Sequence, residues 1–341
     1  MVLTMNKNSQ VLGQKFDVPK VIFLICTLST AIIVIFVVGV TFIEAFPTFT
    51  REGLSFITGS VWDYDNNDYG ILPLIGSTLI MTFITMLIAI PMGVLTAIFL
   101  AEFAPVWLKK IMRPMIELLV GIPSVVYGVL GFYVIGVFMQ SDFNPLIINT
   151  LGFIPIFKGM TGARGNILLA SVVLAIMVLP TITALSEEAI RSVPEEYRHA
   201  SYALGSTKYE VLRNAVLPVA VPGVLSAIVL GIMRAMGETM AVVMLIGDVY
   251  QIPASVFDRG YAMTSYILTQ MIYNIGFEEP RSALFGIAAV LFAMELAMLL
   301  LAKLILNYRI IHPYQTLIRS ANGFIDYFKG GIKDGAKSPK P

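Results

Sequence analysis

Residue types that build metal centres and covalent cross-links are almost absent from this sequence of 341 residues. It contains one cysteine, Cys26, inside an apolar run, and two histidines, His199 and His312, which lie far apart in the chain. A single thiol cannot form a disulfide within the chain, and a zinc site needs three or four ligands close together. We therefore expect neither a disulfide framework nor a bound metal.

Charged residues are scarce as well. They make up 13% of the sequence, against 57% for hydrophobic residues, and the mean hydropathy is +0.81. Soluble domains carry about 25% charged residues, so this composition predicts a polytopic membrane protein, which we expect to be all-α. The net charge of +1 gives no sign of a basic surface that would bind nucleic acid.

The sequence also lacks a nucleotide-binding loop. No G-x-x-x-x-G-K-[ST] stretch is present, and this is the loop with which many ATPases hold nucleotide phosphates. We therefore predict that the chain is not an enzyme and does not hydrolyse ATP itself. Energy for any transport would come from a partner protein or from an ion gradient.

The hydrophobic residues are gathered into six charge-poor segments, each long enough to cross a bilayer core of about 30 Å. We expect membrane spans at about 21–43, 71–101, 115–139, 166–186, 219–247 and 283–305. Most Lys and Arg residues fall in the N-terminal segment, the 104–114 turn, the 187–217 loop and the C-terminal tail. By the positive-inside rule, both termini and the 187–217 loop are cytoplasmic. The chain then divides into a cytoplasmic segment 1–20, a membrane domain 21–310 and a cytoplasmic tail 311–341.

The 187–217 loop, EEAIRSVPEEYRHASYALGSTKYEVLRNAVL, reads as two short helices. Ser192–Glu195 and Thr207–Glu210 both have the S/T-x-x-E form of a capping box, which marks a helix start. Gly205 suits the left-handed conformation in which many helices end. Two interpretations stay open: an amphipathic hairpin on the membrane surface, or a rigid knob that another protein grips.

This loop resembles the cytoplasmic coupling loop of ABC importer permeases, in which a glycine precedes a Leu-Pro pair by thirteen residues. Gly205 and Leu217-Pro218 keep that spacing, and Ala200 fits a small position of the loop. His199 stands where the family usually has Glu, and Ser201 replaces an Ala. The resemblance implies that the ATPase-coupling residues are Glu195, His199, Ala200, Ser201, Leu204, Gly205, Leu217 and Pro218.

A charged pair interrupts the fifth expected span. Arg234 lies near its centre, where an arginine costs about 2.5–3.5 kcal/mol and should face protein or a water-filled path. Glu238 follows four residues later, on the same face of a continuous helix. The pair is either an ion pair that joins helices or a guanidinium available to an anion. Arginine suits phosphate because its planar fork donates two parallel hydrogen bonds.

Several hydroxyl groups are weaker candidates for a polar path near Arg234. Most hydroxyls in membrane helices bond back to the backbone or bridge helices, so a packing role is the more frequent one. The candidates are Ser77, Thr78, Thr82, Thr85, Ser124, Tyr127 and Thr239. For Glu295, inside the sixth span, we expect no more than a helix–helix contact.

Three stretches resemble PstC-type permeases of phosphate ABC importers: Gly76–Pro105, Glu117–Phe132 and above all GIMRAMGETMAVVMLIGD, Gly231–Asp248. The resemblance implies a type I ABC importer permease fold in the cytoplasmic (inner) membrane of a prokaryote. It also implies partners: a homologous PstA-type permease, two copies of a PstB-type ATPase and an external PstS-type phosphate-binding protein. A phosphate-sensing regulator is a further partner of such systems. ATP and Mg²⁺ would bind the ATPase, and we expect no cofactor in this chain.

Three alternatives to a phosphate importer remain at this point. The chain could serve an importer of another oxyanion, such as sulfate or molybdate. It could be an ion-coupled secondary transporter in which Glu238 and Glu295 relay protons. It could also be a signalling scaffold that uses the 187–217 loop for docking without any flux.

Overall fold

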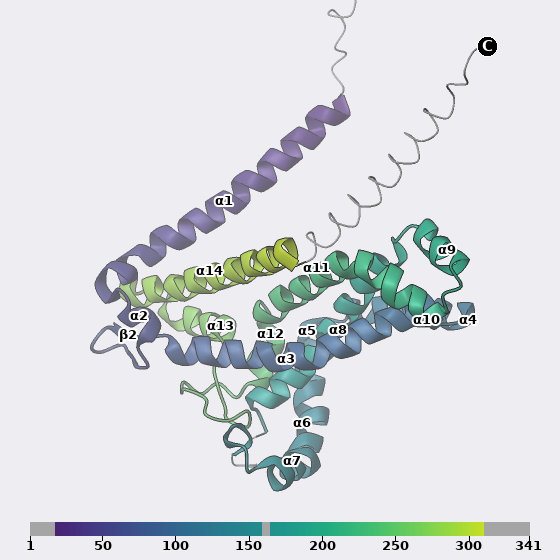
Figure 1. Cartoon of the computed structure of the whole chain (residues 1–341). Coiled ribbons are helices and arrows are strands. Elements are labelled where there is room, and N and C mark those ends of the chain that lie inside the picture. The colour runs from purple at the N-terminus through teal and green to yellow at the C-terminus, as the bar shows by residue number, and fades with distance from the viewer. Residues whose placement is uncertain (1–17, 159–163, 310–341) are drawn as a thin grey trace, which may run out of the picture.

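The structure is a computed structural model that describes residues 18–158 and 164–309 (Figure 1). Most of the expected N-terminal segment 1–20 and the whole tail 311–341 lie outside the described residues. Within the described part, six helical segments are long and apolar enough to span a membrane. They are Pro19–Glu52, Leu72–Phe103, Ser124–Leu151, Ile167–Arg191, Lys208–Met236 and Glu278–Leu304. The prediction of six spans in an all-helical membrane domain is confirmed.

The long helices differ in how they are built. Three run almost unbroken: α1 (Val18–Glu52), α8 (Ile167–Arg191) and α14 (Glu278–Arg309). The others contain π-helical segments or breaks: α3 (Leu72–Ile98) with η1 (Phe99–Phe103), and η5 (Leu212–Val216) with α11 (Leu217–Met236). The third span consists of α5 (Ser124–Leu130), η2 (Gly131–Ile135), α6 (Gly136–Phe138), η3 (Met139–Phe143) and α7 (Asn144–Leu151). The shorter elements α2 (Ser55–Thr58), η4 (Pro155–Phe157) and α13 (Met263–Asn274) connect them.

The centre of the molecule is the packed pair α3 and α8. Gly93 lets the two helices approach closely, because a Cβ there would lie 2.9 Å from Ile182 Cγ2. Hydroxyls at this interface bond to backbone carbonyls of the facing helix: Thr183 Oγ1 donates to Gly93 O, and Ser171 Oγ donates to Met81 O. Close backbones joined by hydroxyls are typical of helix packing in membranes.

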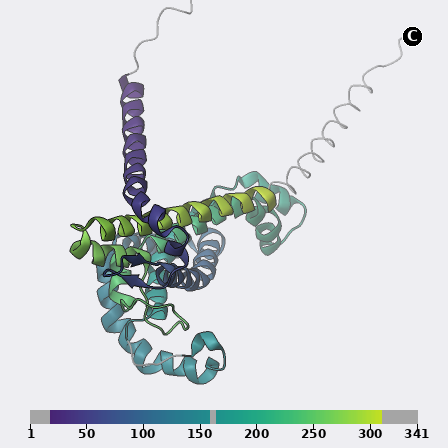
Figure 2. The same cartoon turned by 90° about the vertical axis from the view of Figure 1, so that its left-hand side faces the viewer.

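One end of the molecule is closed by α1 and α14. The antiparallel strands β1 (Trp62–Asp63) and β2 (Asp68–Tyr69) follow α1 and carry an aromatic cluster with Tyr266. The two long helices are joined by the ion pair of Arg51 with Glu279, 2.8 Å between Nη1 and Oε2. Figure 2 shows the first part of α1 standing away from the rest of the body.

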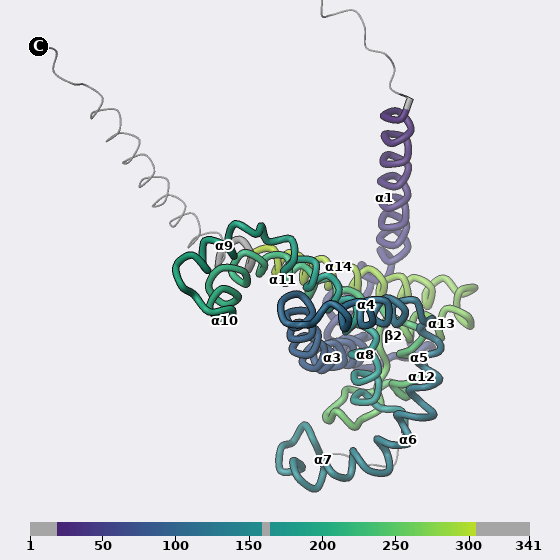
Figure 3. The backbone as a smooth tube through the Cα atoms, turned by 90° about the vertical axis from the view of Figure 1, so that its right-hand side faces the viewer, coloured from purple at the N-terminus to yellow at the C-terminus, as the bar shows by residue number. Residues whose placement is uncertain are grey.

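The opposite end carries a pair of short helices, α9 (Glu195–Ala203) and α10 (Lys208–Val211), which we call the α9–α10 hairpin. Figure 3 shows the hairpin beyond the ends of the long helices, far from β2 and α13. The polar segment of the sequence is therefore a projecting structure, although its first five residues still belong to α8.

The expected third span 115–139 is wrong. Residues Val106–Gly121 form a separate helix, α4, and the membrane-crossing helix begins only at Ser124. The chain is extended at Ile122 (φ −71°, ψ 128°) because a residue before proline avoids the helical region, and Pro123 follows. The span predicted from hydropathy ran across this break, because the end of α4 is as apolar as the start of α5.

The expected fifth span 219–247 is wrong in the same way. α11 ends at Met236, and a short helix, α12 (Met240–Leu245), follows after a break at Gly237–Thr239. Glycine in a helix costs about 1 kcal/mol relative to alanine. The Glu238 carbonyl is satisfied outside the helix, since Thr264 Oγ1 donates to it at 2.9 Å. The residues on both sides of this break are apolar, so hydropathy predicted one continuous span.

Candidate functional site

The first candidate site is the break between α11 and α12, where Arg234 lies in the last turn of α11. Arg234 Nη1 donates a hydrogen bond to Thr181 Oγ1 of α8 at 2.7 Å. Arg234 is half-buried, at a helix end rather than at the centre of a continuous span as expected.

Glu238 is not the ion-pair partner of Arg234. In the described part of the chain no ion pair of 4.0 Å or less joins the two side chains, and Glu238 Oε1 instead accepts the backbone N–H of Ala241 at 3.3 Å. The expected side-by-side placement needs a continuous helix, and Gly237 ends that helix. The interpretation of an ion pair that joins helices is therefore wrong for this conformation.

The second helix break lies close to the first. Gly128 of α5 packs against α12: a Cβ at Gly128 would lie 2.7 Å from Met244 Sδ and 3.3 Å from Ala241 Cα. Tyr127 spans the break between α4 and α5, because its hydroxyl donates to the Leu119 carbonyl at 2.9 Å. Ser124 and Tyr127 on one side and Thr239 on the other therefore belong to two adjoining breaks. Two adjoining breaks were not expected from the sequence.

The hydroxyls of α3 have a different environment. Thr78 Oγ1 accepts the backbone N–H of Met263 at 3.0 Å, and a Cβ at Gly260 would lie 2.7 Å from Ser77 Oγ. Thr85 Oγ1 donates to Met81 O at 2.8 Å and lies 3.2 Å from Ser171 O. These are packing contacts with α8 and the segment before α13, and within the described residues no hydrogen bond joins Ser77 or Thr78 to Arg234.

The side chain of Glu295 lies close to the break between α11 and α12, which was not expected from the sequence. It lies on α14, half-buried, and its Oε1 is 3.6 Å from the place that a Cβ of Gly237 would occupy. The expected helix–helix contact exists, but it brings a third ionisable side chain to the region of Arg234 and Glu238. Nothing in the local sequence of α14 points to this neighbour.

The second candidate site is the α9–α10 hairpin. The capping box at Thr207 is confirmed: Thr207 N donates to Glu210 Oε2 at 2.7 Å, and Glu210 N donates to Thr207 Oγ1 at 3.4 Å. The one at Ser192 is wrong, because Ser192 caps the end of α8 and its hydroxyl donates to Ala189 O at 2.8 Å. α9 begins after Pro194 without a side-chain cap.

Gly205 has the expected left-handed conformation, with φ +82°. Gly205 N donates to Tyr202 O at 2.9 Å and Ser206 N to Ser201 O at 3.3 Å. These two bonds form a Schellman motif, which fixes the turn between α9 and α10. The turn is therefore rigid at the point where the hairpin reverses.

The predicted coupling residues fall into two groups. Leu217 and Pro218 are half-buried at the start of α11, and Ser201 is half-buried in α9. Five lie on the exposed face of the hairpin: Glu195, His199, Ala200, Leu204 and Gly205. Leu204 is 88% exposed, and Tyr202 and Tyr209 of the same hairpin are exposed as well, so the hairpin presents apolar side chains to its surroundings.

Two residues that hold the hairpin were missed from the sequence. Arg198 Nη2 donates to Glu102 Oε1 of η1 at 2.9 Å, and its other donors reach Val193 O and Ile190 O at 2.6 and 3.1 Å. Lys208 Nζ lies 5.0 Å from the centre of the Phe103 ring. Glu102 is 96 residues away from Arg198, so no local pattern could reveal the pair.

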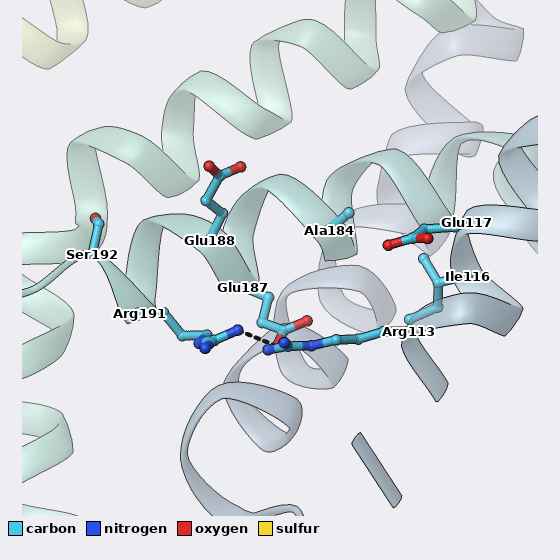
Figure 4. Close-up of a pocket in the computed structure, with 8 residues that line it drawn as sticks. All are labelled: Arg113, Ile116, Glu117, Ala184, Glu187, Glu188, Arg191 and Ser192. Carbon is cyan, nitrogen blue, oxygen red and sulfur yellow. Dashed lines mark hydrogen bonds and ion pairs between the residues drawn. The ribbon is translucent and has the colours of Figure 1, made fainter. Parts of the chain in front are cut away.

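A pocket of about 510 Å³ lies between α4 and α8, close to the hairpin (Figure 4). Arg113 of α4 and Arg191 of α8 approach the same carboxylate, Glu187, while Glu188 points away. Arg113 Nε donates to Glu187 Oε1 at 3.0 Å, its Nη2 contacts the same oxygen, and Arg191 Nη1 lies 4.0 Å from it. Arg113 and Glu187 are 74 residues apart, so no local pattern in the sequence could predict their contact.

The geometry agrees with a known family of membrane proteins. Residues 89–310 match the family described as binding-protein-dependent transport system inner membrane component. The chain belongs to this family. As a member of it, the protein is a multi-pass membrane permease, and the α9–α10 hairpin lies inside the matched region.

Similar proteins agree with this assignment. The chain is 36% identical to the "Probable ABC transporter permease protein YqgH" of Bacillus subtilis, covering 80% of this chain and 83% of the relative. It is 38% identical to the phosphate transport system permease protein PstC of Xylella fastidiosa strain 9a5c, covering 75% and 79%. The PstC of Mesorhizobium japonicum is 32% identical, covering 86% and 91%.

Solved structures support the fold alone. A chain of a bacterial alginate ABC transporter, crystallised with an alginate pentasaccharide-bound periplasmic protein, superposes with a TM-score of 0.54 at 16% identity. The match covers 86% of this chain and 96% of that one. The permease has the type I ABC importer fold that the sequence resemblance implied.

Proposed function

We propose that this chain is the permease subunit of an ATP-driven importer that carries inorganic phosphate across the cytoplasmic membrane of a prokaryote. The observation that carries the proposal is the environment of Arg234. Its guanidinium bonds to the neutral hydroxyl of Thr181 and, among the described residues, has no carboxylate within 4.0 Å. An arginine keeps its charge at physiological pH, and its remaining N–H donors suit a tetrahedral oxyanion.

Phosphate is preferred over sulfate or molybdate because relatives named PstC, phosphate transport permeases, match most of the chain. The two carboxyl groups near the break, Glu238 and Glu295, also favour an oxyanion that still carries a proton. A protonated phosphate can donate a hydrogen bond to a carboxylate, whereas sulfate at neutral pH has no proton to donate. A carboxylate near the path therefore rejects sulfate by repulsion.

The α9–α10 hairpin is the feature that favours an assembly with an ATPase. In this proposal its exposed tip docks on one of two copies of a PstB-type ATPase, which bind ATP and Mg²⁺, while this chain hydrolyses no ATP. A homologous PstA-type permease completes the membrane part, and a PstS-type phosphate-binding protein delivers phosphate from outside. A phosphate-sensing regulator is a further partner. The distribution of Lys and Arg supports a cytoplasmic hairpin and cytoplasmic termini.

Uptake of radiolabelled phosphate tests the proposal in cells that lack their own phosphate transport and express the full set of subunits. We expect uptake that depends on this chain and is not reduced by excess sulfate or molybdate. Arg234→Lys keeps the charge and loses the planar fork, so it should lower uptake while leaving assembly near normal. Uptake of sulfate or molybdate in preference to phosphate would refute the substrate, and ATP-independent uptake by this chain alone would refute the importer.

A further inference from the structure

The pocket between α4 and α8 contains a buried carboxylate that the proposed transport step does not use. The Glu187 side chain is 8% exposed and belongs to α8, one helical turn before α8 ends. Its Oε1 accepts a hydrogen bond from Arg113 of α4. Arg191 of α8 is 53% exposed, and its Nη1 comes no closer to that oxygen than 4.0 Å. Arg113–Glu187 is therefore the strong contact, and it joins two different helices.

Apart from this ion pair, α4 is held by a small apolar cluster around Ile116, Leu100 and Ala104, and by Lys109, whose Nζ donates to Ala101 O at 3.0 Å. Ile116 is the only residue of this helix that the described structure buries. At its end, the chain leaves the helix at Ile122 and turns into α5. A pocket of about 510 Å³ beside Arg113 means that α4 is not packed tightly against α8 along this stretch. Beside the pocket, the Arg113–Glu187 pair is therefore the ion pair that fixes α4 to α8.

The orientation of α4 is transmitted to Arg234. Leu119 of α4 accepts the hydrogen bond of the Tyr127 hydroxyl across the helix break, at 2.9 Å. Gly128, the next residue along α5, packs against Ala241 and Met244 of α12, and α12 follows the break that begins three residues after Arg234. A change in the angle of α4 would therefore pass through Tyr127 to α5 and α12, next to the end of α11 that carries Arg234.

The other partner of the pair is connected to the hairpin. Beyond Glu187, α8 runs for one more turn to Arg191, and only Ser192–Pro194 separate it from α9. Arg198 of α9 holds the Ile190 and Val193 carbonyls at 3.1 and 2.6 Å, so this end of α8 and the hairpin form one stiff unit. A displacement of the hairpin would therefore act directly on the turn that carries Glu187.

We infer that Arg113 and Glu187 are a positioning pair that couples the α9–α10 hairpin to the Arg234 site through α4 and Tyr127. Movement of the hairpin shifts Glu187 and thereby α4. The angle of α4 then sets the position of Tyr127, and with it the placement of α5 and α12 at the break next to Arg234. The inference rests on the proposed function, because it assigns to the pair a part in the same transport cycle.

The test uses the complete transporter reconstituted in lipid vesicles, with phosphate uptake and ATP hydrolysis measured on the same preparation. Replacing both residues at once, Arg113→Gln with Glu187→Gln, removes both charges and leaves no unpaired buried charge that would prevent folding. We expect phosphate carried per ATP hydrolysed to fall about tenfold, within the usual range of coupling between sites. The exchanged pair, Arg113→Glu with Glu187→Arg, should recover at least part of that ratio.

Arg191→Gln is the matched control. It removes one positive charge from the same pocket, as Arg113→Gln does, but at a residue that contacts Glu187 only weakly. We expect its ratio of phosphate to ATP to stay within about twofold of the wild type. The inference is overturned if the double Gln variant lowers only the amount of assembled transporter and keeps the wild-type ratio. It is also overturned if Arg191→Gln lowers the ratio as strongly as the double variant.

A wrong role for the Arg113–Glu187 pair can be told apart from a wrong substrate for the transporter. If the wild-type transporter carries another oxyanion, the same ratio is measured with that anion, and the role of the pair is still decided. If the wild-type chain carries no anion at all in the complete assembly, the proposed function itself fails. In that case the inference falls with it.

Discussion

Two arginines of this permease, Arg198 and Arg234, lie at the ends of short or broken helices and differ in what surrounds them. Arg198 is surrounded by acceptors: a carboxylate of Glu102 and the carbonyls of Val193 and Ile190. Arg234 has one acceptor in the described structure, the hydroxyl of Thr181. A guanidinium whose donors are used serves to fix a structure, whereas one with donors to spare can bind a ligand. Arg198 therefore serves to fix the structure, and Arg234 is available to bind an anion.

The largest effect is expected at Arg234. Arg234→Met removes the cation and its hydrogen bonds to the bound anion, which are worth about 3 kcal/mol in sum, or about a hundredfold in uptake. Phosphate uptake by the assembled transporter measures this loss. Thr181 keeps its place on α8, so the amount of assembled complex should hardly change. If Arg234→Met instead lost assembly and kept uptake per complex, Arg234 would be as structural as Arg198.

The opposite result is expected at Arg198. Arg198→Met leaves Glu102 unpaired in a site where the two side chains are 12% and 15% exposed, and should cost about 2 kcal/mol of stability. The loss should appear as weaker co-purification of the ATPase and a lower melting temperature of the solubilised complex. Adding Glu102→Met should restore most of it. Arg213→Met serves as the control, since Arg213 is exposed in the same polar segment.

The turn of the hairpin gives a smaller effect with a clear origin. A Cβ at Gly205 has no atom within 4 Å, so a substitution there is opposed only by the left-handed backbone at φ +82°. We expect Gly205→Val to cost about 1–2 kcal/mol and to weaken ATPase docking, while the protein still inserts in the membrane. Gly205→Asn should be nearly neutral, because asparagine tolerates this conformation. Equal docking by both variants would show that the turn is not needed.

The smallest effect is expected at Tyr127, which bridges the break between α4 and α5. Tyr127→Phe keeps the ring and removes only the hydrogen bond to Leu119, worth about 1 kcal/mol, or about a fivefold loss of uptake. The affinity of the external binding protein for the transporter should be unaffected. A loss as large as that of Arg234→Met would mean that the phenol itself contacts the anion.

The contrast between the two arginines also explains which features could be predicted from the sequence. The Gly205 turn and the Thr207 capping box depend on residues a few positions apart, so their pattern is visible in the chain. The partners of Arg234 and Arg198 are 53 and 96 residues distant, and no periodicity specifies them. The sequence correctly indicated that Arg234 needs a protein environment but assigned it the wrong neighbour, because hydropathy does not register a break at Gly237.

The number of spans was predictable because bilayer thickness sets the length of an apolar segment. The helix breaks were not, because each depends on how freed backbone groups are satisfied elsewhere. Pro123 and Gly237 were visible in the sequence. However, only the fold shows that α4 is a separate helix and that Thr264 takes over the carbonyl of Glu238.

The close contact at Gly128 has a mechanical consequence. Since even one methyl group at this position would meet Met244 and Ala241, α5 and α12 leave no room to slide past each other. α12 is separated from α11 by the break at Gly237–Thr239, and α5 is separated from α4 by the break at Ile122–Pro123 but continues directly into η2. A change in the direction of α5 would therefore carry α12 with it, and the chain can absorb the difference from α11 at Gly237–Thr239.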